Sequence, residues 1–92
     1  MFVLRRVVGD SMTPALMPGR LVVGIRRVHS VRAGDIVIVN HAGLEKIKRV
    51  EAIRGRGAGR EVFVLGDNPP HSTDSRTFGW LPYSSLAAKV LR

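Results

Sequence analysis

A polar segment of eleven residues, Gly66 to Arg76, contains most of the side chains in this sequence that could do chemistry. It holds two aspartates, one arginine and three hydroxyl-bearing residues, and it follows the apolar run Val62 to Leu65. Polar side chains on a loop that a rigid strand holds in place are typical of functional sites. The sequence therefore predicts a site in this loop.

Ser11 is the candidate nucleophile. It lies in the turn-forming segment Gly9 to Pro14, directly after an apolar run. A serine nucleophile needs an activated hydroxyl and N–H donors for the oxyanion, and a bend of this kind can present both. A serine in such a turn is more often a plain turn residue, so this feature needs support from elsewhere in the chain.

Lys48 is the candidate general base. It lies in the predicted strand 44–53, whose even-numbered side chains, up to position 52, are expected to share one face. In one interpretation its side chain extends to solvent. In the other it is buried beside Ser11, where burial lowers the lysine pKa and leaves a neutral amine that can take the serine proton. A hydroxyl must then hold the amine, and the polar loop offers Ser72, Thr73 and Ser75.

Four charged residues are expected to hold the polar loop in one shape through ion pairs and Asx-type turn bonds: Arg49, Asp67, Asp74 and Arg76. Asn68 precedes a proline, as is typical of a residue that begins a turn. We expect these residues to position the site and not to break bonds.

Short apolar runs separated by turn residues surround these segments. Strands are predicted over 2–8, 21–25, 36–39, 44–53, 61–65 and 86–91, with helical turns only near Ala15 and Tyr83. A chain of 92 residues in which 45% are hydrophobic can form one small core, so a single all-β domain, barrel or sandwich, is expected over residues 1–92. The chain has no cysteine, which excludes disulfides and thiolate metal sites.

Three motifs occur in a fixed order along the chain: Gly9-Asp10-Ser11-Met12-Thr13-Pro14, Ile47-Lys48-Arg49-Val50, and the polar loop from Gly66-Asp67-Asn68 to Ser72-Thr73-Asp74-Ser75-Arg76. In this order they resemble the nucleophile, general-base and third motifs of the signal peptidase I family of Ser–Lys endopeptidases. The resemblance extends from about Val7 to the end of the chain. One such motif is weak evidence, whereas three in order are strong evidence.

The resemblance implies a role for each matching residue. Ser11 corresponds to the nucleophile, Lys48 to the general base, and Ser72 to the hydroxyl that orients the amine. The backbone N–H of Ser11 would form part of the oxyanion hole, and Met12 would line the substrate pocket. Gly9 departs from members that place a side-chain oxyanion donor at this position, so backbone donors must suffice.

The same resemblance implies the supporting ion pairs Arg49–Asp67 and Asp74–Arg76, no cofactor, and a small, partly open β-barrel of the signal peptidase catalytic-core type. The expected substrate is a precursor protein whose N-terminal leader or signal peptide is removed after small residues. Without a visible anchor, the chain is similar to the small proteases that mature nickel-type superoxide dismutase, and equally to a small signal peptidase-like enzyme of a reduced genome.

The charge pattern bears on partners. Fifteen Lys and Arg against seven Asp and Glu give a net charge of +8, which favours contact with phosphate-bearing surfaces. Only 5% of the residues are aromatic, which disfavours nucleic acid as the partner. No apolar run approaches the ~20 residues needed to span a bilayer. We expect a cytoplasmic chain or one in peripheral contact with an anionic membrane; the sequence does not determine the oligomeric state.

Two other functions remain open from the sequence. One is a self-cleaving domain of the kind found in repressors of the DNA-damage response, which share Ser–Lys chemistry. The other is a basic binding module without catalysis, in which Ser11 and Lys48 are ordinary turn and surface residues.

Overall fold

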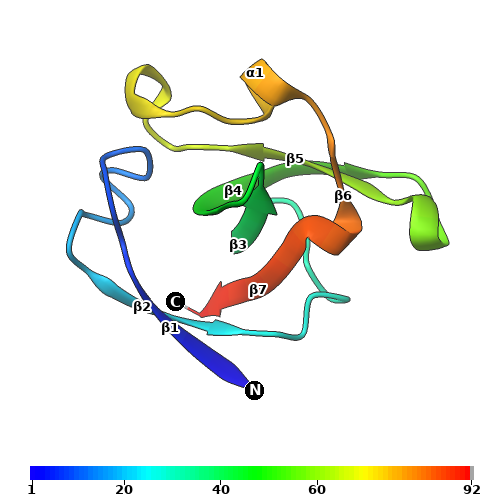
Figure 1. Ribbon diagram of the computed structural model, residues 1–92, viewed down its shortest axis with the longest axis horizontal. Helices are drawn as coiled ribbons and strands as arrows, with labels where there is room; N and C mark the ends of the chain where they lie inside the picture. Colours follow the sequence, from blue (N-terminus) through cyan, green and yellow to red (C-terminus); the bar gives the residue numbers. More distant parts are fainter. Residues whose placement is uncertain (92) are drawn as a thin grey trace.

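The computed structural model describes residues 1–91 as one seven-stranded antiparallel sheet. Its strands are β1 (Phe2–Arg6), β2 (Leu21–Ile25), β3 (Ile36–His41), β4 (Leu44–Arg54), β5 (Glu61–Leu65), β6 (Leu81–Pro82) and β7 (Leu86–Leu91). The sheet order is β1-β2-β7-β3-β4-β5-β6. The sheet curls without closing, with β1 and β6 as its edges (Figure 1). The expectation of an all-β, partly open architecture is therefore confirmed.

Helical structure is limited to short turns. The only α-helix of the described residues is α1 (Ser75–Phe78), and the 3-10 turns are η1 (Gly57–Gly59), η2 (Pro69–His71) and η3 (Tyr83–Ser85). The polar segment predicted as a continuous loop therefore contains η2 and the start of α1. Between the polar segment and the turn at Tyr83, a short strand, β6, was not predicted; it forms because Leu81 is buried in the core and pairs with Val62 of β5.

Two apolar clusters form the core, and β3 contributes to both. Ile36 and Ile38 pack in one cluster, whereas Val37 and Val39 pack in the other. Consecutive residues of a strand point to opposite faces, so a strand buried on both faces is apolar throughout. This explains the unbroken apolar run of β3 in the sequence.

The side chains of β4 were expected to alternate regularly up to position 52, but a β-bulge interrupts this alternation. Val50 pairs with Val64 of β5, but Ala52, not Glu51, pairs with Phe63. The extra residue reverses the alternation beyond it. Ile53, not Ala52, therefore packs with the cluster that contains Val50.

Candidate active site

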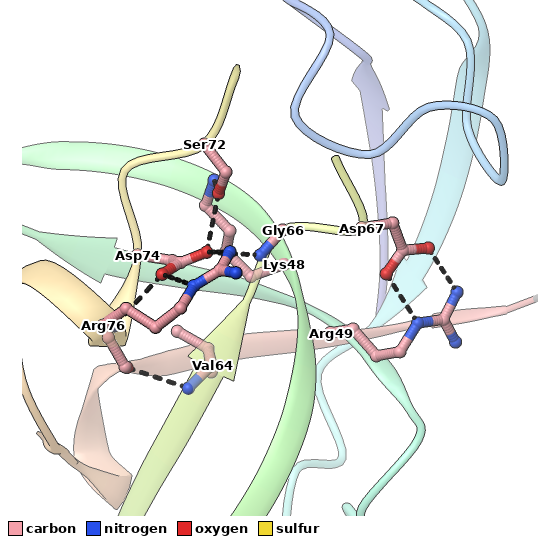
Figure 2. A network of polar contacts seen from close by, with 9 residues as sticks. Lys48, Arg49, Val64, Gly66, Asp67, Ser72, Asp74 and Arg76 are labelled. Atoms are coloured by element: carbon pink, nitrogen blue, oxygen red, sulfur yellow. Dashed lines mark hydrogen bonds and ion pairs between the residues drawn. The ribbon is translucent and has the colours of Figure 1, made fainter. Parts of the chain in front are cut away.

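Lys48 lies in the middle of β4 and is buried, with 4% of its surface exposed. Its Nζ atom donates a hydrogen bond of 3.0 Å to the hydroxyl of Ser72 (Figure 2). Burial is the main cause that lowers the pKa of Lys48. The Asp74 carboxylate opposes this effect, and the charges of Lys46 and Arg76 add to it. The environment therefore makes the neutral amine easier to form than it is for a lysine in water.

The Ser72 hydroxyl links this amine to a buried carboxylate. It donates a hydrogen bond of 2.8 Å to Oδ2 of Asp74 and accepts the bond from Lys48. With its own hydrogen directed at Asp74, the Ser72 oxygen is free to accept from the amine. The position of Lys48 Nζ is therefore set through Ser72 by Asp74.

Asp74 is held in its ionised form at the centre of this network (Figure 2). Its burial alone would raise the pKa of the carboxyl, but hydrogen bonds from the Arg76 guanidinium, the Gly66 N–H and the Ser72 hydroxyl together hold that pKa well below its usual range. The Arg76 side chain contacts both carboxylate oxygens, at 3.0 and 2.5 Å. The backbone N–H of Arg76 donates to Asp74 as well, so the aspartate also caps the start of α1.

Ser11 is half-buried in the turn after β1, and the polar loop holds this turn in place. The N–H of Asn68 donates to the carbonyl of Ser11 at 2.8 Å. The side-chain amide of Asn68 donates to the carbonyl of Asp10 at 3.1 Å and to the hydroxyl of Thr13 at 2.9 Å. Asn68 thus joins the loop to both sides of Ser11.

Gly66 lies between the Ser11 turn and Ser72. A Cβ atom added to Gly66 would come within 2.1 Å of the Ser72 hydroxyl oxygen and 2.8 Å of the Ser11 carbonyl oxygen. Contacts this short are not tolerated in proteins, so only glycine allows the two serines to approach the end of β5 together.

A second ion pair fixes the other end of the loop. Arg49 donates two parallel hydrogen bonds to the Asp67 carboxylate, at 2.9 and 2.8 Å (Figure 2). It donates a third to the carbonyl of Gly34. The hydrogen bond to Asp67 is the main cause that raises the pKa of Arg49. Because Arg49 follows Lys48 directly in β4, the strand that positions the amine also anchors the loop.

Ser11 and Lys48 line the same pocket, which has a volume of about 420 Å³. Its lining includes the end of β1, the Ser11 turn, the start of β4, and His71 and Thr73 from the polar loop. Met12 also contributes, although its side chain is buried in the core. Within residues 1–91 the hydrogen-bond partner of the Lys48 amine is Ser72 and not Ser11.

Residues 1–77 match the family model of Peptidase S24-like proteins, and no curated protein matches the chain. This chain belongs to the Peptidase S24-like family. The family match covers Ser11, Lys48 and all of the polar-loop residues discussed above. The match supports a fold of the Ser–Lys peptidase type. The narrower resemblance to signal peptidase I is not confirmed.

The S24-like site uses its three loop hydroxyls in different ways. Ser72 contacts the amine, Thr73 is exposed at the pocket, and the hydroxyl of Ser75 accepts a buried hydrogen bond of 2.9 Å from the N–H of Val64. Residue type alone could not distinguish these uses. Gly66 was predicted only as part of a motif, because a requirement for empty space leaves no chemical signal in a sequence.

Two kinds of feature are absent from residues 1–91, a membrane-spanning helix and a metal-binding cluster. Across residues 1–91, no helix is long and apolar enough to cross a membrane. In the same residues, no group of three or more His, Asp or Glu side chains could hold a metal ion.

Proposed function

We propose that this chain is a serine endopeptidase in which Ser11 is the nucleophile and Lys48 the general base. The single observation that supports this most is the buried Lys48 amine, held by Ser72 in the pocket that Ser11 lines. A lysine with no role in catalysis would gain by extending its charge into solvent, and this one does not.

The proposed reaction begins with proton transfer. The neutral Lys48 amine takes the hydroxyl proton of Ser11 as the serine oxygen attacks the carbonyl carbon of the scissile peptide bond. The resulting ammonium then gives this proton to the leaving amine nitrogen, and the peptide bond breaks to leave an ester on Ser11. Water, activated by the same amine, hydrolyses the ester and restores the serine hydroxyl.

The oxyanion of the tetrahedral intermediate requires hydrogen-bond donors. Within residues 1–91 the N–H of Ser11 is bonded to no other group of the chain, so it is available to the substrate. Asn68 fixes the Ser11 carbonyl and hence this peptide segment, so the donor is preorganised. Gly9 contributes no side-chain donor.

We further propose that the substrate is the N-terminal leader of a precursor protein, cut after small residues. This part of the proposal rests on the order of the three sequence motifs. The pocket supports it by its size and by its mixed lining, in which Val7, Met12 and Ile47 offer apolar surface next to the charged groups.

Self-cleavage is the second candidate, and the S24-like family match is the observation that favours it. In that reaction the scissile bond belongs to the same polypeptide or to a second copy of it. Mass spectrometry of the purified protein, alone and mixed with a catalytically dead copy, distinguishes the two: a leader peptidase stays intact and cuts only the added precursor.

Active-site variants test the proposal. Ser11→Ala and Lys48→Ala are each expected to lower the rate of precursor cleavage by at least about a thousandfold, because the two residues act as one unit. A serine-reactive phosphonate probe should label wild type on Ser11 and leave Lys48→Ala unlabelled. The exposed Ser84→Ala in η3 is the matched control and should behave as wild type. Cleavage that persists in either active-site variant contradicts the proposal.

A further inference from the structure

One face of β1, β2 and β7 is exposed and largely apolar, with Arg6 beside Leu21 and Lys89 beside Ile25 as its charged members. The strand registers place Phe2 beside Ile25, Leu4 beside Val23, and Val23 beside Leu91, so these side chains form a continuous surface across three strands. We call this surface the outer face; its large exposed members are 40–65% exposed: Phe2, Leu4, Leu21, Val23 and Leu91. Figure 1 shows these strands together along one side of the molecule, at the chain's N-terminus. Contiguous apolar surface of this kind is uncommon on a protein unless a partner covers it.

The strands of the outer face carry only positive charge. Neither β1, β2 nor β7 contains an aspartate or glutamate, and the sequence has no acidic residue from position 11 to position 34. Four exposed arginines stand in or next to these strands: Arg6, Arg20, Arg26 and Arg27. Two acidic residues from outside these strands pair with basic residues in them, Glu45 with Arg5 of β1 and Asp35 with Lys89 of β7. Other acidic side chains pair away from the face, as in Arg54–Glu61 and Arg49–Asp67.

We propose that the outer face binds the surface of a membrane that contains anionic lipids. Apolar side chains that enter the boundary between headgroups and acyl chains, together with basic residues that attract anionic headgroups, are the two components of interfacial binding. The outer face has both, with apolar side chains at its centre and arginines at its rim.

The charges argue against the other occupants of such a face. A second copy of the chain would bring the arginines of two molecules with a net charge of +8 each against one another, and like charges in contact are destabilising. Nucleic acid would need aromatic side chains on which bases stack, but the face offers one aromatic ring, that of Phe2.

The proposed orientation brings the pocket close to the bilayer. β1 supplies Leu4 to the outer face, and its last residues, Arg5 and Arg6, line the pocket that contains Ser11. A substrate that is itself held at a membrane would therefore meet the site without leaving the surface. Membrane binding is nevertheless independent of catalysis and can be measured without it.

Cosedimentation of the full chain with lipid vesicles tests the proposal. Vesicles of phosphatidylcholine with phosphatidylglycerol should bind about tenfold more tightly than vesicles of phosphatidylcholine alone, and added salt should weaken this binding. Equal binding to the two kinds of vesicle, or binding to neither, would overturn the proposal.

Matched variants locate the surface. Leu4→Ser combined with Val23→Ser should weaken binding to anionic vesicles by about tenfold or more, because two apolar side chains are lost from the face. Leu44→Ser is the control, since Leu44 is also largely exposed but lies at the β3–β4 hairpin. Arg26→Gln should weaken binding by about fivefold, and Arg56→Gln, near η1, should not. Thermal unfolding of each variant establishes that the fold is retained.

Two further results would decide against a membrane partner. If sedimentation velocity shows a dimer that Leu4→Ser with Val23→Ser dissociates, the face joins two copies of the chain. If the control variants weaken vesicle binding as much as the outer-face variants do, the attraction comes from the overall charge and the face has no special role.

Discussion

The Asp74 carboxylate organises the site by satisfying several donors at once. It accepts hydrogen bonds from Ser72, from Gly66 and from both the backbone and side chain of Arg76. A buried charge is tolerated only when it is paired and fully hydrogen-bonded, and these groups meet that requirement. The consequence for catalysis is that the Lys48 amine has a fixed position even though no charged group contacts it directly.

Gly66→Ala tests how closely this arrangement is packed. The added methyl group would overlap the Ser72 hydroxyl and press on the Ser11 carbonyl, so the amine and nucleophile should both be displaced. We expect kcat to fall by about a hundredfold or more, with a loss of about 1–3 kcal/mol in the free energy of unfolding. The measurements are steady-state cleavage of a precursor peptide and denaturant unfolding.

Gly59→Ala is the control for this substitution, because a Cβ atom at Gly59 would meet nothing within 4 Å. It should leave both activity and stability close to wild type. If Gly66→Ala also left activity and stability unchanged, the Ser72 hydroxyl would have room to move. The proposal that Ser72 orients Lys48 would then be contradicted.

At the scale of elements, β4 supplies both the amine and the anchor of the polar loop. Lys48 and Arg49 are consecutive and point to opposite faces of the strand. Any movement of the polar loop relative to β4 would therefore disturb the Arg49–Asp67 pair and the contact of Lys48 with Ser72 together.

Arg49→Leu should therefore reduce activity more than the loss of an exposed ion pair elsewhere on the surface would. We expect about a tenfold loss in kcat/KM and a loss of about 1–2 kcal/mol in stability, because Asp67 loses two hydrogen bonds and Gly34 loses one. Arg54→Leu, in the same strand, removes the exposed pair with Glu61 and the contact of the guanidinium with the Trp80 ring; it should cost about 1 kcal/mol without affecting activity. Equal effects of the two variants on kcat/KM would show that the loop is held in another way.

The elements differ in how well the sequence predicted them. Strands such as β2 and β5 lie where alternating or apolar runs between turn residues predicted them. The helix α1 was missed because the Asx-type turn bond expected in this loop, formed here from the Arg76 N–H to Asp74, does not show by itself that the turn continues into a helix. The bulge in β4 was missed because Glu51 is an ordinary exposed residue whose type gives no sign that it lies outside the pairing.

From residue types alone, the sequence predicted which residues form the candidate site but not how they contact one another. Residue types and their order indicated Ser11, Lys48 and the polar loop, because reactive groups have distinctive chemistry. Which hydroxyl contacts the amine depends on distances between segments far apart in the sequence, and these are set by sheet pairing. The structure brings Ser72 to Lys48, while their roles in cleavage stay predictions.

At the scale of the whole molecule, the lowered pKa of Lys48 links stability to pH. A lysine whose pKa is lower in the folded than in the unfolded state makes the unfolded chain bind more protons, so its destabilising effect is complete below the folded pKa. The effect disappears as pH rises toward ~10.4, the ordinary lysine value.

Lys48→Met should accordingly be more stable than wild type at neutral pH, with a difference that shrinks as pH increases. If Lys48 is the general base, as proposed, this variant should also be inactive, which is the expected trade between stability and function. Thermal unfolding of both proteins from pH 6 to pH 10 measures the difference. A variant that is less stable than wild type throughout would mean that the folded chain favours the charged amine.

Because Glu51 lies outside the regular pairing with β5, one residue can be lost at this point of β4 without changing which side chains face the core. If Glu51 were deleted, Ala52 would take up the regular pairing opposite Phe63, and Ile53 would still face the core beside Val50. Deleting a residue between Lys48 and Val50 would instead turn the lysine out of the pocket or Val50 out of the core. The length of β4 can therefore change at position 51 without moving Lys48 relative to the core, so the loss of this one residue should leave the geometry of the site intact.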